Sequence, residues 1–405
     1  MTRPQETFTD MLARLFPMPG IQLGINSPHS KCITFQVTED CNLRCSYCFA
    51  ETGEYHGGRA LMSPEVGKAA LDFLVAHSGK RKHLEVDFFG GEPLMNFGVV
   101  KELVAYGRKL EQEHNKLFRF TLTTNGVAVD DEFIEFANKE LYNVVISIDG
   151  RKEVHDKLRV TPNGKGSFDL IFPKVKKLAF ARQERGLDYY VRGTFTRNNL
   201  DFSKDVEFLA NEGFEQISLE PVVLEPGDPL SIRVEDLTQV FKEYDRLVGM
   251  LYSRRKTGQW FNFFHFMLDL ENGPCLAKRM TGCGAGSEYC AVSPQGDIYP
   301  CHQFVGKPEW KMGSVLTGEY DRAMQKCFRE CTVASKPACR ECWAKYYCSG
   351  GCAANAQNLN GDIHKPYELA CAMEKKRLEC AIALYALERQ DREEEAASAS
   401  GPAHI

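Results

Sequence analysis

The sequence predicts an α/β protein in which an open, partial (β/α)6 TIM-like barrel is followed by a small cysteine-rich domain. Two observations carry this prediction. Between about residues 33 and 255, short β-rich runs alternate with longer runs of helical apolar spacing, which is typical of parallel βαβ units. From Cys275 onward the chain holds 12 of its 16 cysteines and many glycines and prolines. Six βα units are too few for a complete eight-stranded barrel, so we expect the barrel to be open.

Strands are predicted where β-branched and aromatic residues concentrate. They are Ile33–Thr38, Leu84–Phe89, Arg119–Thr124, Asn143–Ile148, Tyr189–Thr196 and Gln216–Pro221. Between them, apolar residues recur at helical spacing and predict helices. These are Leu94–Gln112, Asp131–Lys139, Phe168–Gln183 and Phe202–Asn211. Functional side chains are expected at the carboxyl ends of the strands, where parallel sheets form their sites.

We divide the chain into four parts. Residues 1–30 are an N-terminal extension with a short helix predicted over Glu6–Phe16, and residues 31–258 are the barrel, which a helix over Val234–Thr257 closes. Residues 275–380 are the cysteine-rich domain, whose short elements indicate a fold held by metal rather than by an apolar core. Residues 390–405 are charged and then rich in Ala, Ser and Gly, so we predict a disordered tail.

Composition limits the classes of function. The net charge of −5 provides no basic surface for nucleic acid, and no apolar run is long enough to span a membrane. The first residues lack the continuous apolar stretch of a signal peptide, so we expect a cytoplasmic protein. In that reducing compartment, clustered cysteines indicate metal or iron–sulfur ligands, with disulfide bonds as the alternative.

Three cysteines, Cys41, Cys45 and Cys48, follow the first predicted strand with the spacing C-x3-C-x2-C. Four-iron clusters are normally bound by four Cys thiolates, so three thiolates on one loop leave one iron open to another molecule. A three-cysteine zinc site and buried thiols are the alternatives. With the aromatic Tyr47 before the last cysteine, the loop resembles the signature of the radical S-adenosylmethionine (SAM) superfamily. The similarity extends over about residues 31–375.

This resemblance implies a SAM-binding [4Fe–4S] cluster at the loop, with Cys41, Cys45 and Cys48 as the catalytic ligands. In the family, the reduced cluster cleaves SAM to a 5′-deoxyadenosyl radical, which removes a hydrogen atom from the substrate. Tyr47 would pack near the adenine. Gly90, Gly91 and Glu92 resemble the family's GGE motif, which receives the methionyl amine; glycines permit close backbone approach, and a carboxylate accepts hydrogen bonds from an ammonium.

Further SAM contacts are implied at later strand ends. Ser147 and Asp149, which end the fourth predicted strand, would meet the ribose, and Arg192 in the fifth would pair with the SAM carboxylate. Asp149 could instead be a turn-forming residue, and Arg192 could instead form a salt bridge at the strand edge.

The cysteine-rich domain holds a second array with the order C-x12-G-x4-C, then C-x2-C-x5-C-x3-C, then C. This order resembles the SPASM extension of the superfamily, which holds two auxiliary [4Fe–4S] clusters and implies three clusters in total; a zinc ribbon is the alternative for the C-x2-C part. One auxiliary cluster would use Cys283, Cys301 and Cys352, with either Cys275 or an open iron position as the fourth ligand. The other would use Cys339, Cys342, Cys348 and Cys371. The remaining thiols, interpreted as buried or surface residues, are Cys32, Cys290, Cys327, Cys331 and Cys380.

SPASM enzymes mostly modify ribosomally made peptides, so the resemblance implies a Cys-containing precursor peptide as the substrate. The strings at 283–289, 296–304 and 347–352 resemble the thioether-forming SCIFF/ranthipeptide maturases. Sulfatase maturases typically place Asp after the cysteine equivalent to Cys301, where this chain has His302. Carbon–carbon crosslinking, epimerisation and sulfatase maturation remain alternatives, as does a non-enzymatic iron–sulfur electron carrier.

The resemblance also implies partners. An external electron donor such as flavodoxin or ferredoxin would supply electrons. Many of these maturases begin with a winged-helix domain that recognises the precursor, but only about 30 residues precede the first predicted strand here, too few to fold alone without help. We therefore expect recognition by a separate protein, by another surface, or without a leader peptide.

Overall fold

The computed structural model describes residues 31–55, 58–274 and 276–399. The predicted helix over 6–16 therefore lies outside the described residues, as does Cys275. The strands are β1 (Cys32–Thr38), β2 (Arg44–Cys45), β3 (His83–Gly90), β4 (Leu117–Thr124), β5 (Asn143–Ser147), β6 (Arg159–Val160), β7 (Asp188–Phe195), β8 (Gln216–Pro221), β9 (Asn262–Phe263), β10 (Tyr289–Val292), β11 (Asp297–Tyr299) and β12 (Gly313–Ser314).

Long helices follow most of the parallel strands, and short helices occupy the cysteine-rich part. They are α2 (Pro64–His77), α3 (Phe97–His114), α4 (Asp131–Glu140), α5 (Lys152–Leu158), α6 (Phe168–Gln183), α7 (Ser203–Asn211), α8 (Leu237–Lys256), α9 (Leu276–Arg279), α10 (Arg322–Glu330), α11 (Pro337–Arg340), α12 (Lys345–Cys348), α13 (Ala353–Asn360) and α14 (Glu368–Ala399). None of the helices in these described ranges combines the length and apolar character needed to cross a membrane.

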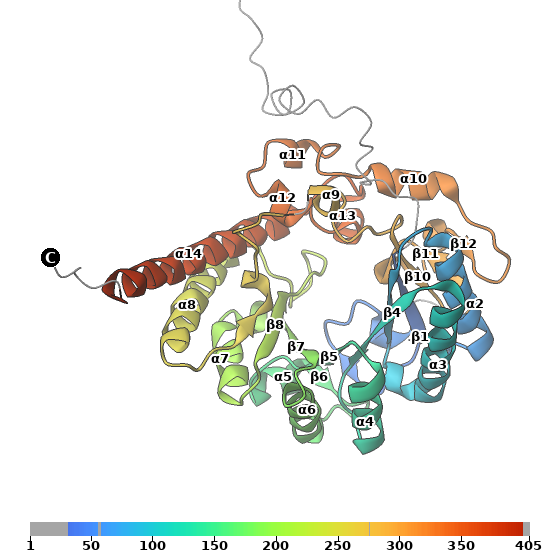
Figure 1. Cartoon of the computed structure of the whole chain (residues 1–405), viewed down its shortest axis with the longest axis horizontal. Coiled ribbons are helices and arrows are strands. Elements are labelled where there is room, and N and C mark those ends of the chain that lie inside the picture. Colours follow the sequence, from blue (N-terminus) through green and yellow to red (C-terminus); the bar gives the residue numbers. More distant parts are fainter. Residues whose placement is uncertain (1–30, 56–57, 275, 400–405) are drawn as a thin grey trace, which may run out of the picture.

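The six predicted strands are β1, β3, β4, β5, β7 and β8, and they lie side by side in that order, all parallel. Helices α2 to α7 cover the outside of this curved sheet, as Figure 1 shows. The fold is therefore the open partial barrel that the sequence predicted, with a cysteine-rich domain after it.

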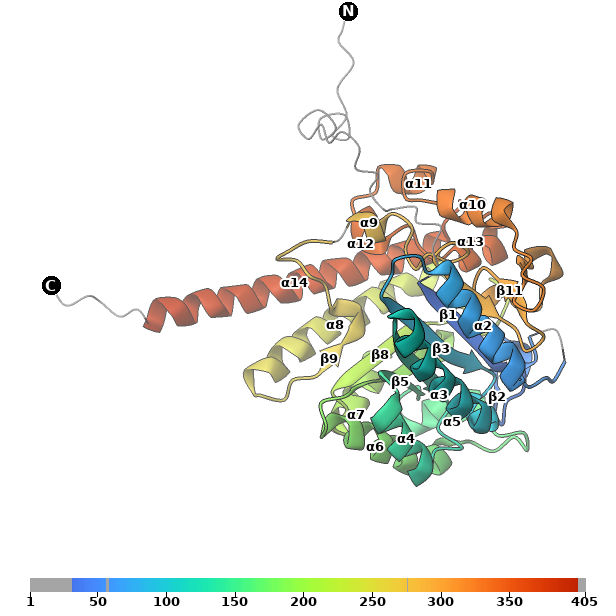
Figure 2. The same ribbon diagram turned by 45° about the vertical axis from the view of Figure 1, so that its right-hand side comes forward.

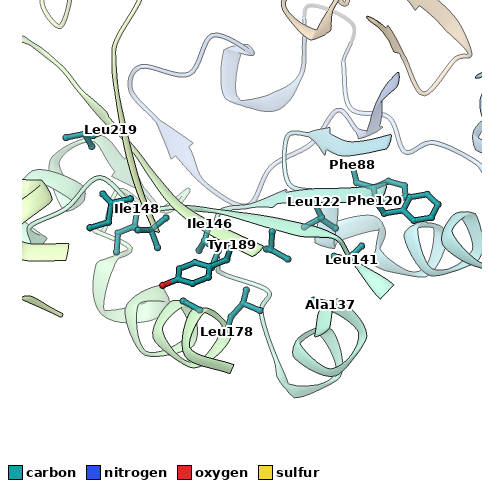
Figure 3. Packing of buried hydrophobic residues seen from close by; sticks show 14 of the residues in the cluster. Phe88, Phe120, Leu122, Ala137, Leu141, Ile146, Ile148, Leu178, Tyr189 and Leu219 are labelled. Carbon is teal, nitrogen blue, oxygen red and sulfur yellow. The ribbon is translucent and has the colours of Figure 1, made fainter. Parts of the chain in front are cut away.

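Alternation along the strands builds the barrel core. In β3, the side chains of Leu84, Val86 and Phe88 are fully buried, whereas the intervening residues point to the barrel interior, because successive strand residues face opposite sides. Figure 3 shows Phe88 beside Phe120 of β4, and their rings stack with centroids 5.8 Å apart. Each such ring contributes about 1.5–3 kcal/mol through burial, so this apolar layer fixes the strand ends that carry the site.

The cysteine-rich domain differs from the prediction that metal alone would hold it. Its strand β10 pairs in parallel with β1, in the register Cys32↔Tyr289 and Phe35↔Val292, and β11 and β12 extend the sheet further. A second apolar cluster includes Tyr299, Phe304 and Phe328 of this domain together with Ala50 and Tyr55, which follow the first cysteine loop. Backbone pairing and a small core therefore attach this domain to the barrel, and Figure 2 shows α9 to α13 beside the sheet.

The last helix, α14, runs beside α8 in both views (Figures 1 and 2). Lys256 of α8 pairs with Asp391 at 3.1 Å, and pairs at i, i+4 spacing, such as Arg389 with Glu393 at 2.8 Å, continue along its exposed face. Such pairs and the alanines that follow favour helix. The prediction of a disordered tail was therefore wrong for residues 390–399, and residues 400–405 lie outside the described part.

Candidate active site

A cavity of about 430 Å³ opens at the carboxyl ends of the parallel strands. Most of the predicted site residues line it, namely Cys41, Cys45, Tyr47, Cys48, Gly90, Gly91, Glu92, Ser147 and Arg192. The cysteine-rich domain contributes His302, Gln303 and Asn355 to the same wall. One cavity therefore joins the first cysteine loop, the ends of the five strands β3, β4, β5, β7 and β8, and the second cysteine region.

The first cysteine loop is held by the strand that precedes it and by a second small sheet. The hydroxyl of Thr38 accepts a hydrogen bond from the Asp40 amide at 3.0 Å, and the Asp40 carboxylate accepts one from the Cys41 amide at 2.8 Å. Cys45 lies in β2, which pairs antiparallel with β6 so that Cys45 faces Arg159 across the ladder. The three thiols therefore open on one cavity from a fixed loop, a donor set that fits a thiolate-bound iron–sulfur cluster.

Two glycines let the end of β3 approach this loop. A Cβ at Gly91 would lie 2.0 Å from the Asp40 carbonyl oxygen, and a Cβ at Gly90 would lie 2.2 Å from that of Thr38. Gly90 also has φ +132, a conformation that other residues rarely adopt. Only glycine at both positions allows the backbone of β3 to pack directly against the loop that carries Cys41.

Glu92 follows these glycines and is fully buried. Its carboxylate accepts hydrogen bonds from the Thr124 hydroxyl at 2.8 Å and from the Asn125 amide at 2.7 Å. Burial raises the pKa of Glu92 to about 6, against the lowering effect of these hydrogen bonds. Arg192, a cation, lines the same cavity. The cavity therefore has a carboxylate that can pair with an ammonium group and a guanidinium that can pair with a carboxylate group.

Asp149 is placed differently from the expected ribose contact. It is fully buried and does not belong to the cavity wall. Its oxygens accept a hydrogen bond from the Tyr47 hydroxyl at 2.8 and 2.9 Å, and one of them accepts another from the Thr194 amide at 3.1 Å. Asp149 therefore anchors Tyr47 from behind, while Ser147, two residues earlier, reaches the cavity.

Arg192 lies in the cavity wall with half of its side chain exposed. Its guanidinium is 3.8 Å from Glu220 of β8, a loose ion pair that leaves hydrogen-bond donors available. Glu220 also contacts Arg377 of α14 at 3.5 Å and His265 at 3.7 Å. The salt bridge that the sequence offered as an alternative is thus present, and Arg192 nevertheless faces the cavity.

Some thiols of the second array lie close enough to one another to influence each other's pKa. Burial raises the pKa of Cys301, and the charges of Cys352 and Cys283 raise it further, so these three thiols are neighbours. Burial likewise raises the pKa of Cys371 to about 11, with Cys348, Cys339 and Cys342 as the neighbouring thiols that add to the rise. Within the described residues, no three Cys, His, Asp or Glu side chains converge tightly enough to hold a single ion; the ligands of a four-iron cluster are spread around a larger body.

Arg159 and His302 are among the cavity residues that sequence reasoning did not assign to the site. Arg159 enters it because β6 folds back onto β2, a pairing that no local pattern announces. His302 follows the predicted ligand Cys301 directly, and that adjacency was a usable signal. Its Nδ1 lies 2.9 Å from the hydroxyl of Tyr289 on β10, which fixes its ring at the wall.

Comparisons with known proteins agree with this geometry. Residues 35–191 match the family described as the radical SAM superfamily, and residues 283–343 match the iron–sulfur cluster-binding SPASM domain. A cysteine-type anaerobic sulfatase-maturating enzyme of Clostridium novyi is 25% identical, covering 79% of this chain and 87% of its own. An AdoMet-dependent heme synthase of Nitratidesulfovibrio vulgaris is 27% identical, covering 87% and 95%. The mycofactocin maturase MftC of Mycolicibacterium smegmatis is 29% identical, covering 84% and 82%.

A solved structure shares the fold. The native anSMEcpe with bound AdoMet and Cp18Cys peptide superposes with a TM-score of 0.71 at 21% identity, covering 90% of this chain and all of that one. The chain therefore contains a radical SAM domain over residues 35–191 and a SPASM iron–sulfur domain over residues 283–343, and these two domains support S-adenosylmethionine and [4Fe–4S] clusters as its cofactors.

Proposed function

We propose that the protein is an enzyme that forms thioether bonds, from a cysteine sulfur to a carbon atom, in a ribosomally made precursor peptide. The observation that carries this proposal is the continuity of two cavities. The one that holds the first cysteine loop shares Glu220, Pro221, Val223 and Asn355 with a neighbouring cavity of about 260 Å³ that Cys352 lines. A peptide lying across this shared wall would reach from the SAM side to the second array.

A peptide substrate is supported by the relatives. Two of the similar proteins are named as maturases or maturating enzymes, and the similar solved structure holds a peptide together with AdoMet. Thioether formation in particular is supported by the cysteine-rich strings of this chain and by His302 where sulfatase maturases typically have Asp. The substrate would come from a small Cys-containing precursor, recognised through a separate protein or another surface of this one.

The residues of the central cavity have two roles in this proposal, because some would hold the first cluster and others would bind SAM. Cys41, Cys45 and Cys48 would hold a [4Fe–4S] cluster, which together with SAM would supply the chemistry that removes one hydrogen atom from the peptide. The Glu92 carboxylate would accept hydrogen bonds from the methionyl ammonium of SAM, and Arg192 would pair with the methionyl carboxylate. Ser147 would contact the ribose of SAM, and Tyr47 would lie beside its adenine. Each thioether bond removes two hydrogens from the peptide. One would leave as a hydrogen atom that ends on 5′-deoxyadenosine, the other would leave as the thiol proton to solvent, and the one surplus electron would pass to the clusters of the second array.

The second array completes the assignment of three clusters. One set is Cys283, Cys301 and Cys352, with Cys275 as the fourth ligand or with one position open, and the other set is Cys339, Cys342, Cys348 and Cys371. The surplus electron would leave through these sets, and a flavodoxin or ferredoxin would supply the electron that starts each turnover. Such thiol-dependent chemistry belongs in a reducing compartment, which the cytoplasm provides.

Mass spectrometry of the peptide product tests the proposal. The reconstituted enzyme is incubated with SAM, dithionite and a Cys-containing precursor from a neighbouring gene. We expect loss of two hydrogens per bond and a cysteine that no longer reacts with iodoacetamide. Unmodified thiols beside a change at another residue would refute thioether formation, and conversion of a sulfatase-type Cys peptide to an aldehyde would favour sulfatase maturation, which the first relative suggests.

Two cysteine variants divide the chemistry, and a third is their control. Cys48→Ala should abolish 5′-deoxyadenosine formation, whereas Cys342→Ala should retain part of it and stop crosslinking. Cys327→Ser removes an exposed thiol outside both sets and should do neither. If the Cys48 and Cys342 variants behaved alike, the division of labour between the loop and the second array would be wrong.

A further inference from the structure

Arg159 is a buried cation beside the first cysteine loop. It lies in β6 directly opposite Cys45 of β2, only 8% of it is exposed, and it lines the central cavity. Its Nη1 donates a hydrogen bond to the Tyr47 hydroxyl at 2.8 Å. The backbone pairing with Cys45 and the hydrogen bond to Tyr47 therefore hold Arg159 against the loop that carries the three thiols.

The backbone around Arg159 is built to keep it there. The Ser167 hydroxyl donates to the Arg159 carbonyl at 2.6 Å, and His155 Nε2 lies 3.0 Å from the same hydroxyl. His155 and Ser167 are both fully buried. Burial lowers the pKa of His155 to about 2, so this histidine stays neutral and acts as a support for β6.

No carboxylate neutralises this cation directly. Across the described residues, no Asp or Glu oxygen lies within 4.0 Å of the Arg159 guanidinium, and its Nε has no hydrogen-bond partner. Asp149 is reached only through the hydroxyl of Tyr47. A buried charge without a counter-ion is costly, so the arrangement calls for an anion on the cavity side, where the three thiols open.

We propose that Arg159 is a positioning residue whose positive charge is the counter-ion of the cluster held by Cys41, Cys45 and Cys48. Because reduction adds a negative charge to the cluster, a cation at this place stabilises the reduced form and raises its reduction potential. Asp149, on the far side of Tyr47, acts with the opposite sign. The proposal rests on the assignment of the loop as cluster ligands and is independent of thioether formation.

Arg159 and Asp149 lie on opposite sides of the Tyr47 hydroxyl. The Arg159 guanidinium donates to that hydroxyl at 2.8 Å, and the Asp149 oxygens accept from it at 2.8 and 2.9 Å. Because these two buried charges beside the loop have opposite signs, removing each of them should shift the cluster potential in opposite directions.

The test is a redox titration of the reconstituted holoenzyme, without SAM, followed by electron paramagnetic resonance. The relevant signal is the one that is missing from the Cys45→Ala protein. Arg159→Gln should lower the midpoint potential of this signal, and Arg159→Lys should restore part of the loss. Asp149→Asn, which keeps the shape of the side chain, should raise the midpoint. Arg182→Gln is the matched control, because Arg182 is also fully buried but hydrogen-bonds only backbone carbonyls of the Ala137–Tyr142 segment and of Asp188.

Opposite shifts in the Arg159→Gln and Asp149→Asn proteins would support the proposal, since a loosened loop would move both in the same direction. An unchanged midpoint in Arg159→Gln, or shifts of equal sign in the two variants, would overturn it. If the Arg159→Gln protein assembled no cluster, the Arg159→Lys and Asp149→Asn proteins would still show whether the midpoint potential shifts in the predicted direction. If no signal disappeared in Cys45→Ala, the cluster assignment itself would fail, which is a separate outcome.

Discussion

Gly91 offers the most direct test of how the site is assembled. A methyl group at this position would lie 2.0 Å from the Asp40 carbonyl oxygen, 2.5 Å from its carbonyl carbon and 3.1 Å from the Cys41 nitrogen. All three atoms are backbone and cannot rotate away. Contacts of a Cβ atom under 3.0 Å essentially never occur, so in Gly91→Ala the end of β3 and the Cys41 loop must separate by at least about 1 Å to bring the carbon and the oxygen to that limit.

This separation would act on the reaction through position. The Glu92 amide donates to the Asp40 carbonyl at 2.9 Å, so moving Asp40 displaces both the loop and the carboxylate that we assign to the methionyl ammonium. A misplacement of about 1 Å can cost about 100-fold in rate, which corresponds to about 2.7 kcal/mol of activation free energy. We therefore expect Gly91→Ala to form 5′-deoxyadenosine about 100-fold more slowly than the wild type.

The assay is 5′-deoxyadenosine formation from SAM and dithionite, normalised to the iron content of each protein. Gly98→Ala is the matched control, because a Cβ there meets nothing within 4 Å and alanine in a helix is neutral or stabilising by up to about 1 kcal/mol. It should retain full activity. A Gly91→Ala protein with wild-type turnover would show that the close approach of β3 to the loop is not required, and the reasoning would be refuted.

Three further predictions follow from buried groups. Because burial raises the pKa of Glu92 to about 6, SAM binding measured by calorimetry should weaken as the pH falls below about 6 and the carboxylate is neutralised. The Glu92→Gln protein should bind SAM weakly at every pH. A wild-type affinity for SAM that stays constant down to pH 5 would exclude the contact between Glu92 and the ammonium. Arg182→Ala should lower the free energy of unfolding by about 3 kcal/mol, because the backbone carbonyls of Ala137, Leu141, Tyr142 and Asp188 lose the hydrogen bonds that the Arg182 guanidinium donates; a urea titration unchanged from wild type would contradict this. Phe120→Ala should cost about 3–5 kcal/mol in the same titration, since the ring is fully buried between Phe88 and Phe118; a loss below 1 kcal/mol would mean that the core repacks there.

The barrel could be predicted because its signals are local. Each predicted strand begins and ends within about two residues of the observed one, since β-branched and aromatic runs and the turns after them are short-range features. The cysteine spacings likewise placed Cys41, Cys45 and Cys48 on one cavity. Long-range pairing has no such local signature, so β10 joining β1 and β6 joining β2 were not foreseen.

The direction of individual side chains was the other feature that the sequence did not predict. Asp149 and Arg159 lie on neighbouring segments, and the sequence favoured Asp149 because it directly follows a strand end. In the structure the strand turns Asp149 inward to Tyr47, and the β6 backbone brings Arg159 to the cavity instead. Which of two polar residues faces a site depends on the path of the backbone between them, and a single sequence does not fix that path.

The parallel pairing of β1 with β10 has a consequence for synthesis on the ribosome. Thr34 and Tyr289, which are joined by a hydrogen bond between these strands, are 255 residues apart. At about 5–20 residues per second, this separation takes roughly 13–50 s to translate. Until then one edge of β1 carries unpaired amides and carbonyls, which other nascent chains can join. The final step of folding therefore waits for the cysteine-rich domain, and a chain stopped before residue 289 would keep an open, aggregation-prone edge.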